Sequence, residues 1–312
     1  MGPHLETALR LAVRALLPST LLTLAAILAW STDARAGAWA RNRGEAYAKA
    51  SVSYLKSEEM FDDSGDLRPL FDPALYDRSR YAERGSALYV EYGLFDALTL
   101  LGSLPLKIVE QDADGLYGAG DLHGEAFGFA DLHLGARVPL HRGRWAAAIE
   151  PDLKIPLRGA PEIVSTAPTL STGITDFGAA LCLGTSVPRV RGYGQGSIGY
   201  RIRGGRTAEE EYWDLEAGLE PVRGWRVRFR YDGVHSKRDL GGGGAVEAEA
   251  PVPGVGEQDF QRIAPAIAFA LGRSNEISVT WRRAVDGRST LRSSEWEVGF
   301  SFLGKVVPAP GL

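Results

Sequence analysis

Five ionisable residues lie on two segments that flank a predicted turn at 139–144: Asp131, His133, Glu150, Asp152 and Lys154. In each segment they alternate with apolar residues, so an extended chain would place all five on one face. Carboxylates beside an imidazole can bind a divalent cation or transfer protons. The same residues, completed by Arg137, can instead form ion pairs in a narrow interior, where polar groups need partners. We favour the ion-pair network, and expect no metal ion, no cofactor and no catalytic residue.

A second charged set lies further along the chain: Arg201, Asp214, Glu216, Arg228 and Arg230. In the hairpin that turns at 221–224, same-face pairing sets Glu216 opposite Arg228 or Arg230, and one of these registers sets Asp214 opposite Arg230. In the preceding hairpin, one register sets Arg201 opposite Asp214. Opposite charges facing each other across strands contribute about 0.2–1 kcal/mol. The pattern predicts one cluster, with Asp214 between two arginines, that narrows the interior.

Three other candidates for chemistry are weaker. Gly194–Gly199 fits the G-x-G-x-x-G dinucleotide motif, but Tyr200 and Ile202 continue a strand pattern where that motif requires a helix. No G-x-S-x-G motif is present, and no serine is placed beside His133 by sequence, so lipid hydrolysis is only a minor alternative. The single cysteine, Cys182, excludes an intrachain disulfide, and we interpret it as a small filler of the interior face.

The elements that would position these residues are strands, because hydrophobicity repeats every second residue from residue 45 onward. For example, Trp225, Val227 and Phe229 alternate with arginines. The pattern predicts twelve strands, near 45–55, 86–93, 98–110, 124–138, 145–157, 174–184, 193–203, 210–220, 225–235, 260–271, 276–284 and 290–302.

The connections between these strands separate a membrane barrel from a soluble sandwich. Short links, such as 94–97 and 221–224, alternate with longer ones, such as 56–85 and 236–259. Short turns at one end, longer loops at the other and an even number of strands are typical of an outer-membrane barrel. The sequence therefore predicts an all-β fold: a transmembrane, antiparallel, up-and-down β-barrel of about twelve strands. The acidic loop 57–84 would either fold into its mouth or stay solvated.

The first 36 residues read as a secretory signal peptide. Arg10 and Arg14 precede an uncharged run, and Ala34-Arg35-Ala36 is an A-x-A cleavage pattern. A single transmembrane anchor is the alternative, which Pro18 disfavours. We expect a signal peptide at 1–36 and a barrel domain at 37–312. Because the formal net charge is −4, the chain lacks the basic character of a nucleic-acid-binding protein.

Two segments carry a resemblance to a known family. Residues 92–100, Tyr-Gly-Leu-Phe-Asp-Ala-Leu-Thr-Leu, and residues 129–137, Phe-Ala-Asp-Leu-His-Leu-Gly-Ala-Arg, resemble Gram-negative barrels of the MetA-pathway-of-phenol-degradation type. The final strand, Trp296 to Phe302, resembles the aromatic-ended signal of outer-membrane assembly. The resemblance implies an outer-membrane location and a part in the uptake of small organic compounds. It supplies no catalytic residues.

From these observations we expect a monomer, surrounded by outer-membrane lipid, that acts as a passive channel or uptake protein for a small organic solute. Lumen charges of both signs predict weak ion selectivity. The alternative, from another class, is a non-conducting barrel that serves as a surface scaffold or a partner in envelope assembly. The sequence names no solute, and assigns no role to Cys182 or His133.

Overall fold

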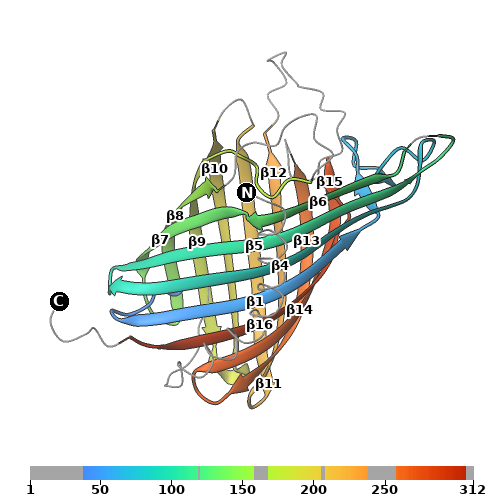
Figure 1. Ribbon diagram of the computed structural model, residues 1–312. Coiled ribbons are helices and arrows are strands. Elements are labelled where there is room, and N and C mark those ends of the chain that lie inside the picture. The colour runs from blue at the N-terminus through green and yellow to red at the C-terminus, as the bar shows by residue number, and fades with distance from the viewer. Residues whose placement is uncertain (1–37, 119, 158–167, 205–207, 238–257, 307–312) are drawn as a thin grey trace, which may run out of the picture.

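The chain forms a closed, antiparallel, twelve-stranded β-barrel, as the alternation of residues predicts (Figure 1). This computed structural model describes residues 38–118, 120–157, 168–204, 208–237 and 258–306. The predicted signal peptide therefore lies outside the described residues. Among those residues, no helix is long and apolar enough to cross a membrane.

The wall is built from strands that each pair with their chain neighbours. In chain order they are β1 (Glu45–Ser57), β4 (Tyr76–Phe95), β5 (Leu98–Gly115), β6 (Leu122–Phe129), β7 (Asp131–His141), β8 (Trp145–Pro156), β9 (Asp176–Val187), β10 (Gly192–Arg203), β11 (Glu210–Val222), β12 (Trp225–Ser236), β13 (Asp259–Leu271), β14 (Asn275–Arg288) and β16 (Ser294–Lys305). Strands β6 and β7 are two parts of one barrel strand, interrupted at Ala130. Pairing of β1 with β16 closes the barrel.

The two ends of the barrel differ in their connections. Five links of two to four residues, at 96–97, 142–144, 188–191, 223–224 and 272–274, share one end, which we call the short-turn end. A 3₁₀ turn, η1 (Pro188–Val190), forms one of them. The opposite, long-loop end carries the longer connections, including 58–75 and 157–175.

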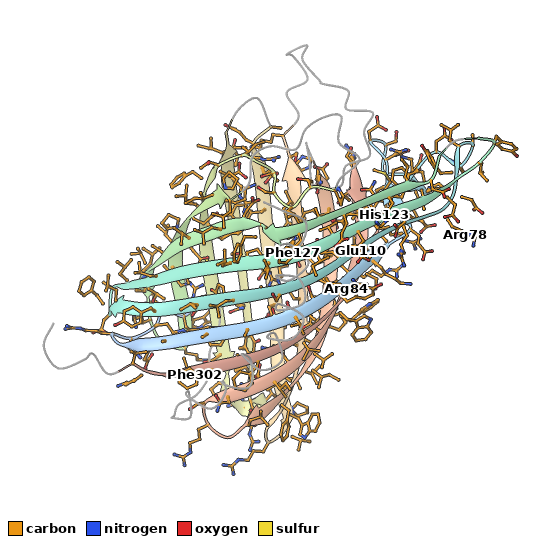
Figure 2. The ribbon with its side chains drawn as sticks, in the orientation of Figure 1. Arg78, Arg84, Glu110, His123, Phe127 and Phe302 are labelled. Carbon is orange, nitrogen blue, oxygen red and sulfur yellow. The ribbon has the colours of Figure 1, made fainter. Side chains whose placement is uncertain are left out.

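An apolar belt surrounds the outside of the barrel. Its exposed side chains, such as Leu88, Leu134, Leu215 and Val279, come from alternate positions of successive strands. Exposed aromatic residues mark both edges, with Trp145 and Trp225 at the short-turn end and Tyr54 and Trp296 toward the long loops. Phe302 ends the apolar face of β16 but is buried (Figure 2).

The predicted loop 57–84 is partly strand. It contains β2 (Glu59–Phe61) and β3 (Leu67–Pro69), which form a small sheet with β15 (Thr290–Leu291), and β4 begins ten residues earlier than predicted. Its apolar residues make a second hydrophobic core with β4 and β5: Met60, Leu70, Phe71, Tyr81, Val109, Ala113 and Leu170. The loop is therefore not merely solvated, whereas its folding into the mouth stays a prediction.

Beyond the apolar belt, β4, β5 and β6 continue as a projecting ribbon with a charged outer surface. Arg84 pairs with Glu110, and Arg80 with Asp112, each at 2.7 Å. His123 accompanies Asp112 on the same face (Figure 2). Polar side chains have replaced the apolar ones here because this face is no longer against lipid.

Candidate functional site: the barrel interior

Three cavities follow one another along the lumen. On β14, Glu276 lines a cavity of about 350 Å³ at the short-turn end, Thr280 lines a middle cavity of about 80 Å³, and Ala284 lines a cavity of about 290 Å³ at the long-loop end. Strand β13 gives the same order, since Ala266 lines the middle cavity and Arg262 the long-loop cavity. The interior therefore holds a row of spaces along the barrel axis, the smallest of the three in the middle.

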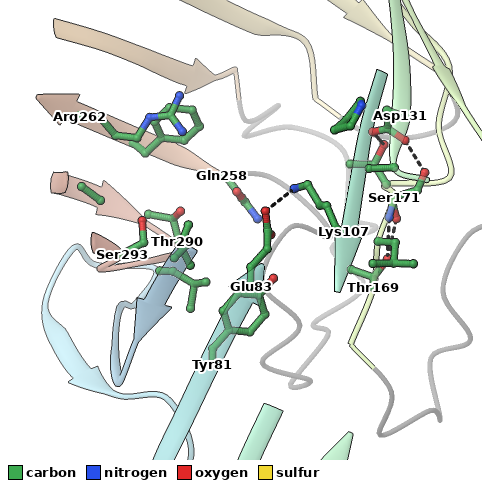
Figure 3. Close-up of a pocket in the computed structure, with 18 of the residues that line it drawn as sticks. Tyr81, Glu83, Lys107, Asp131, Thr169, Ser171, Gln258, Arg262, Thr290 and Ser293 are labelled. Carbon is green, nitrogen blue, oxygen red and sulfur yellow. Dashed lines mark hydrogen bonds and ion pairs between the residues drawn. The ribbon is translucent and has the colours of Figure 1, made fainter. Parts of the chain in front are cut away.

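The long-loop cavity is lined by both apolar and charged side chains (Figure 3). Leu170 and Leu291 line it where the second hydrophobic core meets the lumen. Glu83 accepts a salt bridge from Lys107 at 3.0 Å across neighbouring strands. On the other side, the Ser171 hydroxyl donates to Asp131. The segment 168–175 is thus fixed over this cavity by a side-chain contact.

The short-turn cavity is lined by aromatic residues and arginines. Trp39, Tyr47 and Tyr193 provide its rings. Arg226 and Arg228 both bind Glu276, at 2.8 and 2.9 Å. Tyr47, Arg228, Glu276 and Ser301 also line the middle cavity, so the two spaces meet at these side chains.

A layer of ion pairs lines the middle cavity and reaches the long-loop cavity at Arg262. Arg262 binds Asp232 at 2.5 Å, and Lys49 binds Glu297 at 2.5 Å. Arg230 pairs with Asp214 and Arg282 with Glu295. A solute moving along the lumen would pass within reach of both charge signs.

The N-terminal segment before β1 enters the short-turn end of the lumen. The Arg41 guanidinium binds Glu91 at 2.6 Å, and Glu91 also binds Arg137 at 3.3 Å. Glu91 is 1% exposed, so this carboxylate is fully enclosed between two guanidiniums. Ala38 packs beside Cys182 and three alanines of β8 and β9. The segment therefore occupies space that would otherwise belong to the lumen.

A second buried network continues along the same wall. The Lys154 ammonium forms an ion pair with Asp176 at 2.5 Å and lies 3.7 Å from the Asp131 carboxylate. It also donates a hydrogen bond to the Thr172 hydroxyl at 2.8 Å. Arg203 binds Glu210 at 2.9 Å and lies 3.8 Å from Asp176. These charges are almost wholly buried and mutually paired, which is the arrangement that a dry interior requires.

The predicted cluster of Arg201, Asp214, Glu216, Arg228 and Arg230 shares the lumen face, but its registers are partly wrong. Glu216 lies opposite Arg230, one of the two registers considered, and this sets Asp214 opposite Asp232. Arg201 lies opposite Glu210, whereas Asp214 lies opposite Ser197.

The error in the β10–β11 hairpin is four residues, although both strands end where predicted, at Arg203 and Glu210. Alternation fixes the face of each residue but does not distinguish registers that differ by an even number of residues. Arg201 therefore binds Glu210 at 3.1 Å, away from Asp214, and Asp214 contacts a single arginine, Arg230. Arg228 binds Glu276 of β14, and Tyr193 donates to Glu216. The five residues are thus divided among separate contacts.

The other predicted set, Asp131, His133, Glu150, Asp152 and Lys154, is also divided. Glu150 binds Arg137 at 2.8 Å, as the ion-pair interpretation expects. Asp152 accepts a hydrogen bond from Tyr212 at 2.8 Å. His133 lines the long-loop cavity directly opposite Ser103 of β5, a neighbour that the sequence did not indicate. In the part of the chain that the structure describes, no three metal-ligating side chains group together.

Two important residues escaped the sequence analysis. Arg41 precedes the first strand, where no periodicity signals an inward orientation. Glu276 could have been found from the sequence. It lies an even number of residues from Arg282 on the same strand, so alternation places both side chains on the lumen face of β14.

Among solved structures, the fold is similar to that of the COG4313 outer membrane channel from Pseudomonas putida F1, with a TM-score of 0.64. The match covers 87% of this chain and 100% of that chain at 11% identity. The NanC porin matches more loosely, with a TM-score of 0.49, 8% identity, and coverage of 82% and 98%. No family model and no curated protein matches the sequence. At this identity the similarity shows the fold, which is one used by outer-membrane channels.

Proposed function

We propose that this barrel lies in the outer membrane and conducts small organic solutes. The row of three cavities along the lumen is the observation that carries the proposal. The apolar belt with aromatic edges supports a membrane location, and the fold of the COG4313 outer membrane channel supports the outer membrane. Under this proposal the short-turn end faces the periplasm.

The resemblance of residues 92–100 and 129–137 to barrels of the MetA-pathway-of-phenol-degradation type supports small organic compounds as the solute. Ion pairs line the middle of the lumen. Aromatic rings line the cavity at the short-turn end, and leucine side chains line the cavity at the long-loop end. A solute with both polar and apolar parts would be compatible with these surfaces. The charges of both signs in the middle layer again favour weak ion selectivity.

A specific observation favours the non-conducting alternative: the N-terminal segment occupies the lumen and is anchored by Arg41. The purified barrel in planar bilayers distinguishes the two functions. We expect discrete conductance steps from the native chain and larger steps from Arg41→Ala, because the anchor of the segment is lost. If neither protein conducts and neither supports liposome swelling with small sugars or aromatic compounds, the scaffold function is favoured.

The minor alternative, a lipid hydrolase, has its own test. His133 and Ser103 face each other across β5 and β7, so these are the residues to substitute. The channel proposal expects no fatty acid to be released from labelled phospholipid by the native barrel. Release that disappears in His133→Ala would replace the channel proposal with an enzymatic one.

A further inference from the structure

The short-turn end carries a ring of exposed basic side chains, here called the basic collar: Arg43, Arg142, Arg144, Arg189, Arg191, Arg223, Arg273 and Lys305. Four of the five short turns contribute at least one arginine, and the ends of the wall at β1 and β16 contribute the rest. The collar therefore follows the circumference of the barrel.

The collar is not neutralised by carboxylates. Within the described ranges of the chain, none of its eight cations forms an ion pair, and the acidic residues at this end are Glu45, Asp96, Glu220 and, inside the lumen, Glu276. Glu276 is already bound by Arg226 and Arg228. Glu220 is already engaged by Arg226 of the lumen, and Glu45 accepts from Asn42. Arg142 and Arg144 reach only backbone or amide oxygens. A net positive surface therefore remains.

The long-loop end treats its cations differently. Arg80, Arg84 and Arg292 are exposed or half-buried, yet each binds a carboxylate within 2.7 Å. Lys237 likewise binds Glu211 at 2.7 Å. Among the described residues, Arg68 and Arg288 are exposed at this end without an ion pair, but acidic residues outnumber basic ones in the neighbouring segment 58–77. An excess of positive charge is therefore found at the short-turn end and not at the long-loop end.

The collar lies beside the aromatic edge of the apolar belt. Arg144 directly precedes Trp145, and Arg223 lies two residues before Trp225, whose ring packs on Phe269 at 5.0 Å between centroids. Both tryptophans are exposed outward. Since such rings sit at the level of lipid headgroups, the neighbouring guanidiniums lie where headgroup phosphates would be.

We propose that the basic collar binds the headgroups of anionic phospholipids in the leaflet at the short-turn end. This inference rests on the membrane location proposed above. A ring that encloses the barrel fits a partner that surrounds it, namely lipid, better than a protein partner, which would need one localised patch. Each Lys or Arg near an anionic membrane surface raises the binding constant for that surface about fivefold.

The test compares two double variants in phosphatidylcholine vesicles. Arg223→Gln/Arg273→Gln removes two collar charges, and Arg68→Gln/Arg288→Gln removes two exposed charges from the long-loop end, so the change in net charge is matched. Spin-labelled phosphatidylglycerol and phosphatidylcholine report the relative association of each lipid with the barrel. We expect the native chain and the long-loop variant to prefer phosphatidylglycerol, and the collar variant to lose most of that preference.

An equal preference in all three proteins, or an equal loss in both variants, overturns the proposal. Neither Arg223 nor Arg273 lines a cavity, so the collar variant should conduct as the native chain does. Lost lipid preference with intact conductance supports the collar, whereas unchanged preference with intact conductance refutes the collar alone. If no protein conducts, the proposed channel function is refuted, and the spin-label measurement still tests the collar on its own.

Discussion

The two walls of the lumen carry similar charges in opposite surroundings. The buried wall includes Arg41, Glu91, Arg137, Lys154, Asp176 and Arg203, which are less than 10% exposed. The cavity wall, on β1 and β12–β14, carries Lys49, Arg226, Arg228, Arg230, Arg262 and Arg282, whose exposures run from 20% to 44%. The inserted N-terminal segment and the segment 168–175 cover the first wall and leave the second one open.

This difference separates structural charges from those available to a solute. On the buried wall, each charge depends on its partner because water is excluded. On the cavity wall, solvent reaches the cation of each pair, so the loss of its partner costs less and the freed charge faces the lumen. If the barrel conducts as proposed, the same residue types should serve stability on one wall and permeation on the other.

The largest effect should follow loss of Glu91. Glu91→Gln leaves Arg41 and Arg137 without their shared carboxylate, and should reduce the free energy of unfolding by about 3–5 kcal/mol. Urea unfolding of the barrel in vesicles measures this. The matched change on the cavity wall, Arg230→Gln, should cost about 0–1 kcal/mol, because Arg230 is 44% exposed. Equal losses from both variants would show that the walls do not differ.

The next effect tests the outer surface of the wall. Leu215 of β11 faces outward at 53% exposure, between lumen residues Asp214 and Glu216. Leu215→Arg should cost about 2–4 kcal/mol near the bilayer midplane and reduce assembled barrel. Asp214→Asn, one residue away on the lumen face, should assemble nearly as the native chain does. Similar damage from both changes would mean that β11 is buried on both faces.

Much of this fold could be read from the sequence, because a period of two is a local property. Each predicted strand overlaps an observed strand, and the lumen face of β12 was assigned correctly from its arginines. The register of β10 against β11 was wrong although the strand ends at Arg203 and Glu210 were predicted correctly. Alternation keeps the same residues on the lumen face in every register shifted by an even number of residues, so it could not select one. The anchor at Arg41 could not be predicted, since a non-periodic segment enters the lumen through tertiary contacts alone.

A smaller effect should appear in permeation. Arg228 separates the short-turn and middle cavities, where it binds Glu276. Arg228→Ala widens this junction and removes a positive charge, so conductance should rise and selectivity should shift toward cations. An ion passing at about 4 Å would feel a change of about 1 kcal/mol in a water-like environment. Reversal potentials in a salt gradient measure the shift, with Arg288→Ala at the exposed long-loop end as the control. An unchanged reversal potential would show that Arg228, like the charges of the buried wall, contributes to stability and not to permeation.

The smallest effect lies outside both walls, on the projecting ribbon. The hydrogen bond to Asp112 raises the pKa of His123, since the carboxylate stabilises the imidazolium. A raised pKa means that the interaction stabilises the ribbon fully below the ordinary pKa of histidine, and that this stabilisation is lost as the pH rises through the raised value. The His123 ring is 71% exposed, so solvent should keep the change in overall stability small.

A titration of the His123 ring protons by NMR, in the native barrel and in Asp112→Asn, measures this pair directly. Asp112→Asn should lower the pKa of His123, because the neutral amide cannot stabilise the charged ring to the same degree. An unchanged pKa would show that the ribbon pair is not formed in solution. Because the ribbon charges are exposed and the buried-wall charges are not, the same kind of substitution should shift a titration on the ribbon but lower the free energy of unfolding at Glu91. The environment of each pair, and not the residue types that form it, therefore determines what the pair contributes.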